Sequence, residues 1–236
     1  MAIAARTHVP PHRELRIAPD LSEALRTADV FLLSSFNVIQ DPATLEARLT
    51  QVRDAMLALP PDSLVVFEDA GYHVPALSRR VRDEMVRFAD VYSLNEDEMQ
   101  AYLGRTVDLL DAPSVAKAVR ELHEVVPAPT LVVHTKYWAL AVGLRAASLR
   151  LALVGGITMA STRFWFGDGF TADDYAATGS LTPGTTAQQL VSDVADLLGS
   201  DACVVPALDL SGVAEPTTIG LGDSFVGGFL AALDRR

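Results

Sequence analysis

The sequence predicts an α/β fold with a doubly wound, mostly parallel sheet and helices on both faces. Two observations carry this prediction. Short apolar, β-branched runs alternate along the chain with longer amphipathic stretches. The short runs are continuously apolar, which is typical of parallel strands buried on both faces. Half of the 236 residues are apolar, enough for one substantial core. We therefore expect one domain over residues 1–236, with residues 1–28 as a lead-in and residues 29–236 as the core.

Five runs have the length and composition of strands. They are Val30–Leu33, Leu64–Phe67, Val91–Leu94, Leu131–Val133 and Ala202–Val205. Between them, residues 42–59 place apolar side chains every three or four positions, and Pro42 suits a first helical turn. Further helices are expected at about residues 75–88, 95–103, 113–126, 186–199 and 223–234.

Two segments are expected to depart from this alternation. Residues 139–144 and 149–153 have the pattern of a hairpin, which would add an antiparallel edge to the sheet. Residues 162–184 are rich in Gly, Asp and Thr without a clear period, which predicts a long functional loop.

Composition excludes several classes of function. A net charge of −11 argues against a nucleic-acid partner, which would require clustered Lys and Arg. No stretch reaches the length of an apolar membrane helix, and the start of the chain lacks a signal-peptide pattern. The single cysteine, Cys203, lies in an apolar run and predicts a packed thiol in a reducing compartment. We expect a cytoplasmic protein with no membrane partner.

Polar residues follow each of the first four predicted strands, where a doubly wound sheet binds its ligands. The segments that follow these strands are residues 34–37, Glu68 with Asp69, residues 95–98, and residues 134–136. Carboxylates at two consecutive strand ends favour a magnesium site that acts through water and phosphate. The alternative is that these are ordinary polar loops.

The strongest local signal is the turn Gly220-Leu221-Gly222-Asp223, which follows an extended segment and opens an apolar helix. Its glycines permit close backbone approach, and a helix start offers amide groups and a positive dipole end to a phosphoryl group. Asp223 would then accept the proton of an attacking hydroxyl. The structural alternative is that the glycines end a strand and Asp223 caps a helix. Gly227-Gly228, inside the helix, predicts close backbone packing.

Arg163 admits two interpretations. It lies in the expected loop and is a candidate phosphate ligand, but a surface arginine or one that pins a loop is the commoner case.

These residues resemble motifs of the ADP-dependent glucokinase and phosphofructokinase family, a branch of the ribokinase-like kinases, and map onto its C-terminal half. Thr218–Asp223 is similar to the catalytic GLGD loop, and Asn95–Glu98 to the NxxE motif. Phe67-Glu68 stands at the HxE-like position, and His134-Thr135 resembles a strand end on the nucleotide side.

The resemblance implies a ribokinase-like fold without the small lid domain, and a kinase of carbohydrate metabolism and glycolysis. ADP would be the donor, AMP a product, a sugar or sugar phosphate the acceptor, and Mg²⁺ the cofactor. The implied residues are Asp223 as catalytic base; Gly220, Leu221 and Gly222 as anion hole; Asn95, His134 and Thr135 at the nucleotide; and Glu68, Glu98 and Asp223 at the metal.

Two departures from the family keep a second hypothesis open. Val66 stands where the HxE motif has its histidine, and family members are nearly twice as long. The half to which this chain does not correspond carries the sugar-binding strands and the lid, which align the acceptor and exclude water. The alternative function is a nucleotide-binding module without catalysis, or one half of a split kinase completed by a second copy or a complementing chain.

Overall fold

A computed structural model describes residues 15–234, so the first half of the predicted lead-in lies outside the described residues. The chain divides into two compact units. The first comprises residues 1–98 with 126–129, and the second residues 99–125 with 130–236. The single core expected over residues 29–236 stays a prediction.

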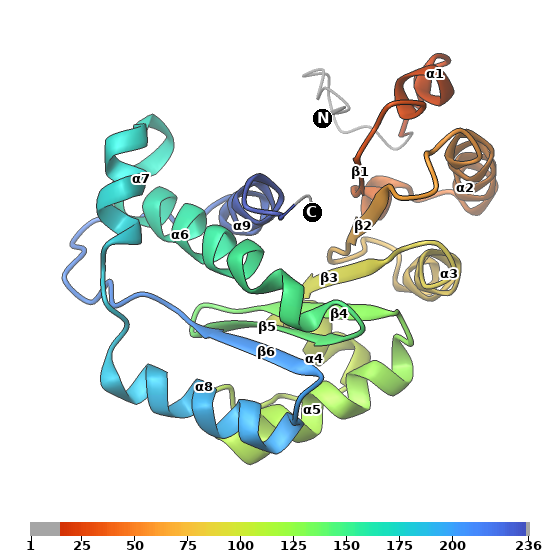
Figure 1. Cartoon of the computed structure of the whole chain (residues 1–236). Coiled ribbons are helices and arrows are strands. Elements are labelled where there is room, and N and C mark those ends of the chain that lie inside the picture. The colour runs from red at the N-terminus through yellow and green to blue at the C-terminus, as the bar shows by residue number, and fades with distance from the viewer. Residues whose placement is uncertain (1–14, 235–236) are drawn as a thin grey trace. The chain divides into compact units, whose positions relative to one another are not determined.

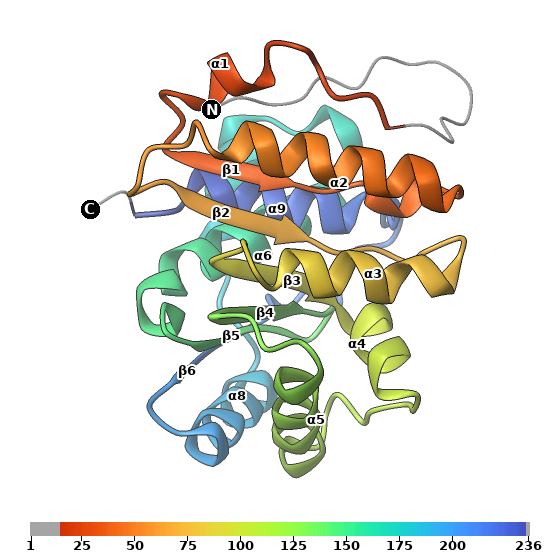
Figure 2. The same ribbon diagram turned by 90° about the vertical axis from the view of Figure 1, so that its right-hand side faces the viewer.

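The first unit contains three parallel strands, β1 (Val30–Leu33), β2 (Leu64–Glu68) and β3 (Val91–Asn95), in the order β1-β2-β3. Its helices are α1 (Leu21–Leu25), the short 3-10 turn η1 (Phe36–Val38), α2 (Pro42–Met56), α3 (Pro75–Met85) and the start of α4 (Glu96–Leu103). Helices α2 and α3 lie along one face of these strands (Figures 1 and 2).

Helix α2 forms as the sequence predicts. Asp41 caps it by accepting the amide of Thr44 at 2.7 Å, and Pro42 occupies its first turn. The face that it buries is Leu45, Leu49, Val52 and Ala55. The strands contribute an aromatic pair to the core, in which Phe67 of β2 contacts Tyr92 of β3 edge-on with ring centroids 4.9 Å apart.

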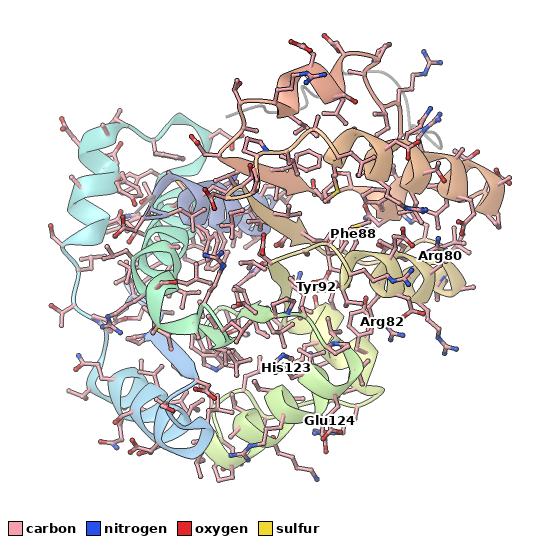
Figure 3. All side chains as sticks on the ribbon, turned by 45° about the vertical axis from the view of Figure 1, so that its right-hand side comes forward. Arg80, Arg82, Phe88, Tyr92, His123 and Glu124 are labelled. Carbon is pink, nitrogen blue, oxygen red and sulfur yellow. The ribbon has the colours of Figure 1, made fainter. Side chains whose placement is uncertain are left out.

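An ion-pair cluster joins α2 to α3. Glu84 on α3 is buried and pairs with Arg80 at 2.8 Å and Arg53 at 2.9 Å, while Arg80 also pairs with Glu46 at 2.6 Å. The side chain of Arg80 is labelled on α3 in Figure 3. Hydrogen bonds from Arg80 hold the pKa of Glu46 below its ordinary value. The two arginines compensate the buried charge of Glu84, which would be costly if it were left alone.

The second unit is built on three antiparallel strands, β4 (Thr130–His134), β5 (Trp138–Gly143) and β6 (Ala202–Pro206). Its helices are the rest of α4, α5 (Ala112–Val125), α6 (Arg150–Phe166), α7 (Ala172–Gly179), α8 (Thr185–Leu198) and α9 (Leu221–Ala231), with 3-10 turns η2 (Ala146–Leu149) and η3 (Gly167–Gly169). Helices α5 and α8 cover one face of the strands and α6 covers the other (Figure 1).

The α/β class and the mixed sheet of a ribokinase-like fold are confirmed, and residues 138–143 form an antiparallel strand as predicted. This strand lies between β4 and β6 and not at an edge. The second predicted hairpin arm is wrong, because Leu149 ends η2 and residues 150–153 begin the helix α6. Residues 162–184 are the end of α6, η3 and α7, so most of the predicted loop is helical. Cys203, expected in the packed core, is half-buried on β6.

Helices α6 and α9 approach each other through glycines. A Cβ atom on Gly228 would lie 2.3 Å from the carbonyl oxygen of Gly155 and 2.5 Å from the Cβ of Met159. A Cβ on Gly156 would meet the ring of Phe225 at 2.7 Å. The predicted close packing is therefore confirmed at Gly228, whereas the space beside Gly227 is open. This contact fixes α9, whose first turn carries the Gly220–Asp223 motif.

Candidate functional site

In the first unit, the predicted carboxylates lie at the carboxyl ends of β2 and β3. Glu68 is the last residue of β2 and stands opposite Ser93 on β3. It is half-buried, and its Oε2 atom is shielded from solvent. Parallel pairing therefore brings the end of β2 beside the end of β3, where Asn95 leads directly into α4.

The Asn95–Glu98 motif forms a reciprocal cap on α4. The side-chain oxygen of Asn95 accepts the amides of Asp97 at 2.7 Å and Glu98 at 3.2 Å. The Oε2 atom of Glu98 in turn accepts the amide of Asn95 at 2.9 Å. This is the capping-box arrangement, which explains the spacing of the motif by helix geometry alone. It also holds the Glu98 carboxylate at the strand end.

Asp69 is a buried residue that the sequence analysis names only as one of the strand-end carboxylates. It is 4% exposed and accepts the hydroxyl of Tyr92 at 2.6 Å and the amide of Ala70 at 2.9 Å. Its own amide donates to the carbonyl of Ser93 at 2.8 Å. Asp69 thus ties the segment after Glu68 to β3. The only signal in the sequence was an acidic pair directly after a buried strand.

In the second unit, Thr135 shapes the turn between β4 and β5. Its hydroxyl accepts the amides of Tyr137 and Trp138 at 3.0 Å each and donates to the Trp138 carbonyl at 3.0 Å. These bonds give the residue a structural role, and its predicted contact with a nucleotide stays a prediction.

His134 connects the end of β4 to the start of α9. Its side chain is 7% exposed and stacks on Phe225, with ring centroids 4.3 Å apart and planes inclined by 18°. Its Cε1 atom would lie 3.9 Å from a Cβ atom on Gly222. His134 therefore lies directly beside the Gly220–Asp223 motif. Its predicted contact with a nucleotide stays a prediction.

The Gly220–Asp223 motif forms the first turn of α9. Gly220 precedes the helix with φ of 74°, a left-handed conformation that favours glycine. The helix starts at Leu221, two residues earlier than predicted, so the amides of Leu221 and Gly222 lie in the first turn, where no acceptor exists within the helix. Asp223 is in the same turn and is exposed. The first helical amides and the carboxylate of Asp223 thus lie at one helix end, and helix N-termini of this kind can bind phosphate groups.

Arg163, near the end of α6, is attached to the residues that lead into this turn. Its Nε donates to the carbonyl of Ile219 at 2.9 Å, and its Nη2 pairs with Asp168 at 2.5 Å. The structure therefore shows the loop-pinning role of Arg163.

The carboxylates do not form a metal cage by themselves. Within residues 15–234, no three His, Cys, Asp or Glu side chains gather closely enough to hold an ion. Glu68 and Glu98 fit a magnesium ion only as partial donors, with water and phosphate oxygens completing its shell, as is usual for this ion. No helix among the same residues is long and apolar enough to cross a membrane.

Several solved kinase structures have a similar fold. A phosphofructokinase from Pyrococcus horikoshii OT3 with AMP has a TM-score of 0.74 at 18% identity over 91% of this chain and 53% of its own. A last common ancestor of ADP-dependent phosphofructokinases from Methanosarcinales gives 0.76 at 16% identity over 95% and 55%. An ADP-dependent kinase in complex with fructose-6-phosphate and ADPβS gives 0.70 at 14% identity over 91% and 55%.

The structural resemblance to these kinases is therefore confirmed at the level of fold, and the chain spans about half of their length. No protein-family model matches the sequence, and no curated protein is significantly similar to it.

Proposed function

We propose that this chain is an ADP-dependent sugar kinase-like phosphotransferase, which transfers the β-phosphoryl group of ADP to a hydroxyl of a sugar or sugar phosphate. The observation that carries the proposal is the first turn of α9, where Gly220 turns the backbone and Asp223 lies among the first helical amides. The fold shared with ADP-dependent kinases supports it, as does the binding of AMP, an ADP analogue and fructose-6-phosphate by those proteins.

In the proposed reaction, Asp223 accepts the proton of the acceptor hydroxyl as the oxygen attacks the β-phosphorus. The bond from that phosphorus to the bridging oxygen breaks, AMP leaves, and a phosphate ester forms on the sugar. The amides of Leu221 and Gly222 stabilise the charge on the transferring oxygens. His134 is the residue that would contact the nucleotide, and its closeness to Gly222 supports this role.

Mg²⁺, when bound, would neutralise charge on the phosphates, and Glu68 and Glu98 are the residues that would hold it, acting through its water ligands. The cap that Glu98 forms with Asn95 orients its carboxylate at the end of β3 before any ligand arrives. Asp69, through Tyr92 and Ser93, does the same for the backbone after Glu68.

The test is the substitution Asp223→Asn, which keeps the shape of the side chain and removes the base. We expect AMP release from Mg·ADP, assayed with glucose and with fructose 6-phosphate, to fall at least about a thousandfold. The affinity for ADP, measured by calorimetry, should change by less than about threefold. Asp196→Asn, the same change at an exposed position of α8, is the matched control. Full turnover in Asp223→Asn would disprove the proposal.

A second candidate is a nucleotide-binding module that needs a complementing chain for the acceptor site. The chain's coverage of only 53% to 55% of the similar kinases favours it. Binding of Mg·ADP without AMP release from either sugar would support this candidate, and turnover by the isolated chain would exclude it.

A further inference from the structure

The end of α6 is attached to the segment that enters the Gly220–Asp223 turn at two successive points. The amide of Thr217 donates to the carbonyl of Phe164 at 2.9 Å, and Nε of Arg163 donates to the carbonyl of Ile219 at 2.9 Å. Together these bonds hold an otherwise exposed stretch, in which Thr218 and Ile219 face solvent.

The second of these bonds acts on the peptide group that precedes Gly220. The Ile219 carbonyl belongs to the same rigid plane as the Gly220 amide, so fixing the oxygen fixes the orientation of that plane. The guanidinium group also occupies the space beside Gly220, because a Cβ atom there would lie 3.2 Å from Cζ and Nη2 of Arg163. Glycine is therefore favoured at position 220 by its φ of 74°, and a Cβ atom there would also crowd the guanidinium of Arg163.

Asp168 orients the arginine from the other side. Its Oδ1 lies 2.5 Å from Nη2 of Arg163, and the side chain of Asp168 is 79% exposed while that of Arg163 is 25% exposed. An exposed ion pair of this kind contributes little to stability. Its effect is geometric, because the planar guanidinium offers Nε and Nη2 in a fixed relation that the ammonium of lysine lacks.

We propose that Arg163 is a positioning residue for phosphoryl transfer. It fixes the peptide plane before Gly220 and thereby the amides and carboxylate of the α9 first turn, and Asp168 fixes Arg163. This role differs from that of a phosphate ligand because it acts through the Ile219 carbonyl, which accepts from Nε of Arg163 while Nη2 pairs with Asp168. This inference rests on the proposed function, since it assigns a positioning role for the same reaction.

The experiment compares Arg163→Lys, Arg163→Met and Asp168→Asn with Arg150→Lys, an exposed arginine at the start of α6 that serves as control. We measure kcat and KM for Mg·ADP, and amide hydrogen exchange of residues 217–224 without nucleotide. We expect both Arg163 variants to lower kcat at least about tenfold with KM for ADP within about threefold, since small misplacements are costly in catalysis. Exchange at residues 217–222 should be faster in both variants, and Asp168→Asn should show the same changes more weakly.

Rescue by lysine, or a rise of KM with kcat unchanged, would overturn the inference in favour of direct phosphate binding. Unchanged exchange at residues 217–222 in Arg163→Lys would overturn it as well. If the wild-type chain releases no AMP, the proposed function fails separately, and hydrogen exchange still decides whether Arg163 positions the turn. Because Arg163→Met removes a partly buried cation, thermal unfolding is recorded for each variant, and Asp168→Asn tests the network if Arg163→Met does not fold.

Discussion

At the scale of single residues, the carboxylate of Glu98 has two separable roles. Its Oε2 atom accepts the amide of Asn95, which a neutral amide side chain at the same helix position can also do. A role toward magnesium, in contrast, depends on the negative charge. A substitution that preserves the acceptor and removes the charge distinguishes the helix cap from the proposed metal function.

Glu98→Gln provides that substitution. We expect its free energy of unfolding to stay within about 0.5 kcal/mol of wild type, whereas Glu98→Ala should lose about 1 kcal/mol with the cap. If Glu98 also serves the metal, both variants should need at least about threefold more Mg²⁺ for half-maximal AMP release. If Glu98→Gln needs the same Mg²⁺ concentration as wild type for half-maximal AMP release, Glu98 serves only to cap α4.

Much of this residue-level detail could be read from the sequence, and some could not. The spacing of Asn95 and Glu98, and the turn at Gly220, are local patterns that short-range geometry interprets directly. The contacts of Arg163 with Ile219 and of Tyr92 with Asp69 join residues 56 and 23 positions apart. No local pattern predicts such contacts. The contact of Asp69 with Tyr92 was therefore not predicted, and Arg163 was left with two possible roles.

At the scale of elements, the strands and most helices were predictable because their apolar residues recur with a clear period. Helix α6 was not, because Arg150–Phe166 is apolar on nearly all sides and contains Gly155-Gly156, residues that ordinarily weaken a helix. Packing against other elements explains why this segment is helical. The glycines let α9 approach, and the helix packs against β5 and β6 as well as α9.

The two adjacent glycines of α9 provide a matched test of this contact. Gly228→Ala should destabilise the protein by about 1–3 kcal/mol, because its Cβ would lie 2.3 Å from the Gly155 carbonyl and neither backbone can yield easily. Gly227→Ala should stabilise it by up to about 1 kcal/mol, since the site is open and alanine favours the helix. Denaturant unfolding measures both, and equal effects of the same sign would contradict the packing described for α6 and α9.

At the scale of the whole molecule, charge is the property that acts on a nucleotide from a distance. The chain carries 30 acidic and 19 basic residues, while its proposed donor is a polyanion. The α9 helix end offers ADP local attraction, while the charge of Arg163 is paired with Asp168 and the net charge of the chain is negative. This balance differs from that of a basic binding surface, where salt weakens binding by screening attraction.

The ionic strength dependence of ADP binding tests that balance. Without Mg²⁺, raising the salt from about 0.02 M to about 0.2 M should tighten ADP binding about twofold or more, because the Debye length shrinks from about 20 Å to about 7 Å and screens repulsion from the acidic protein. Adenosine, which is neutral, should bind with no salt dependence, and Mg·ADP should respond less than ADP. Calorimetry at the two ionic strengths gives the three affinities. Steep weakening of ADP binding with salt would mean that local cations such as Arg163 dominate, and would place the donor phosphates closer to that arginine than a positioning role allows.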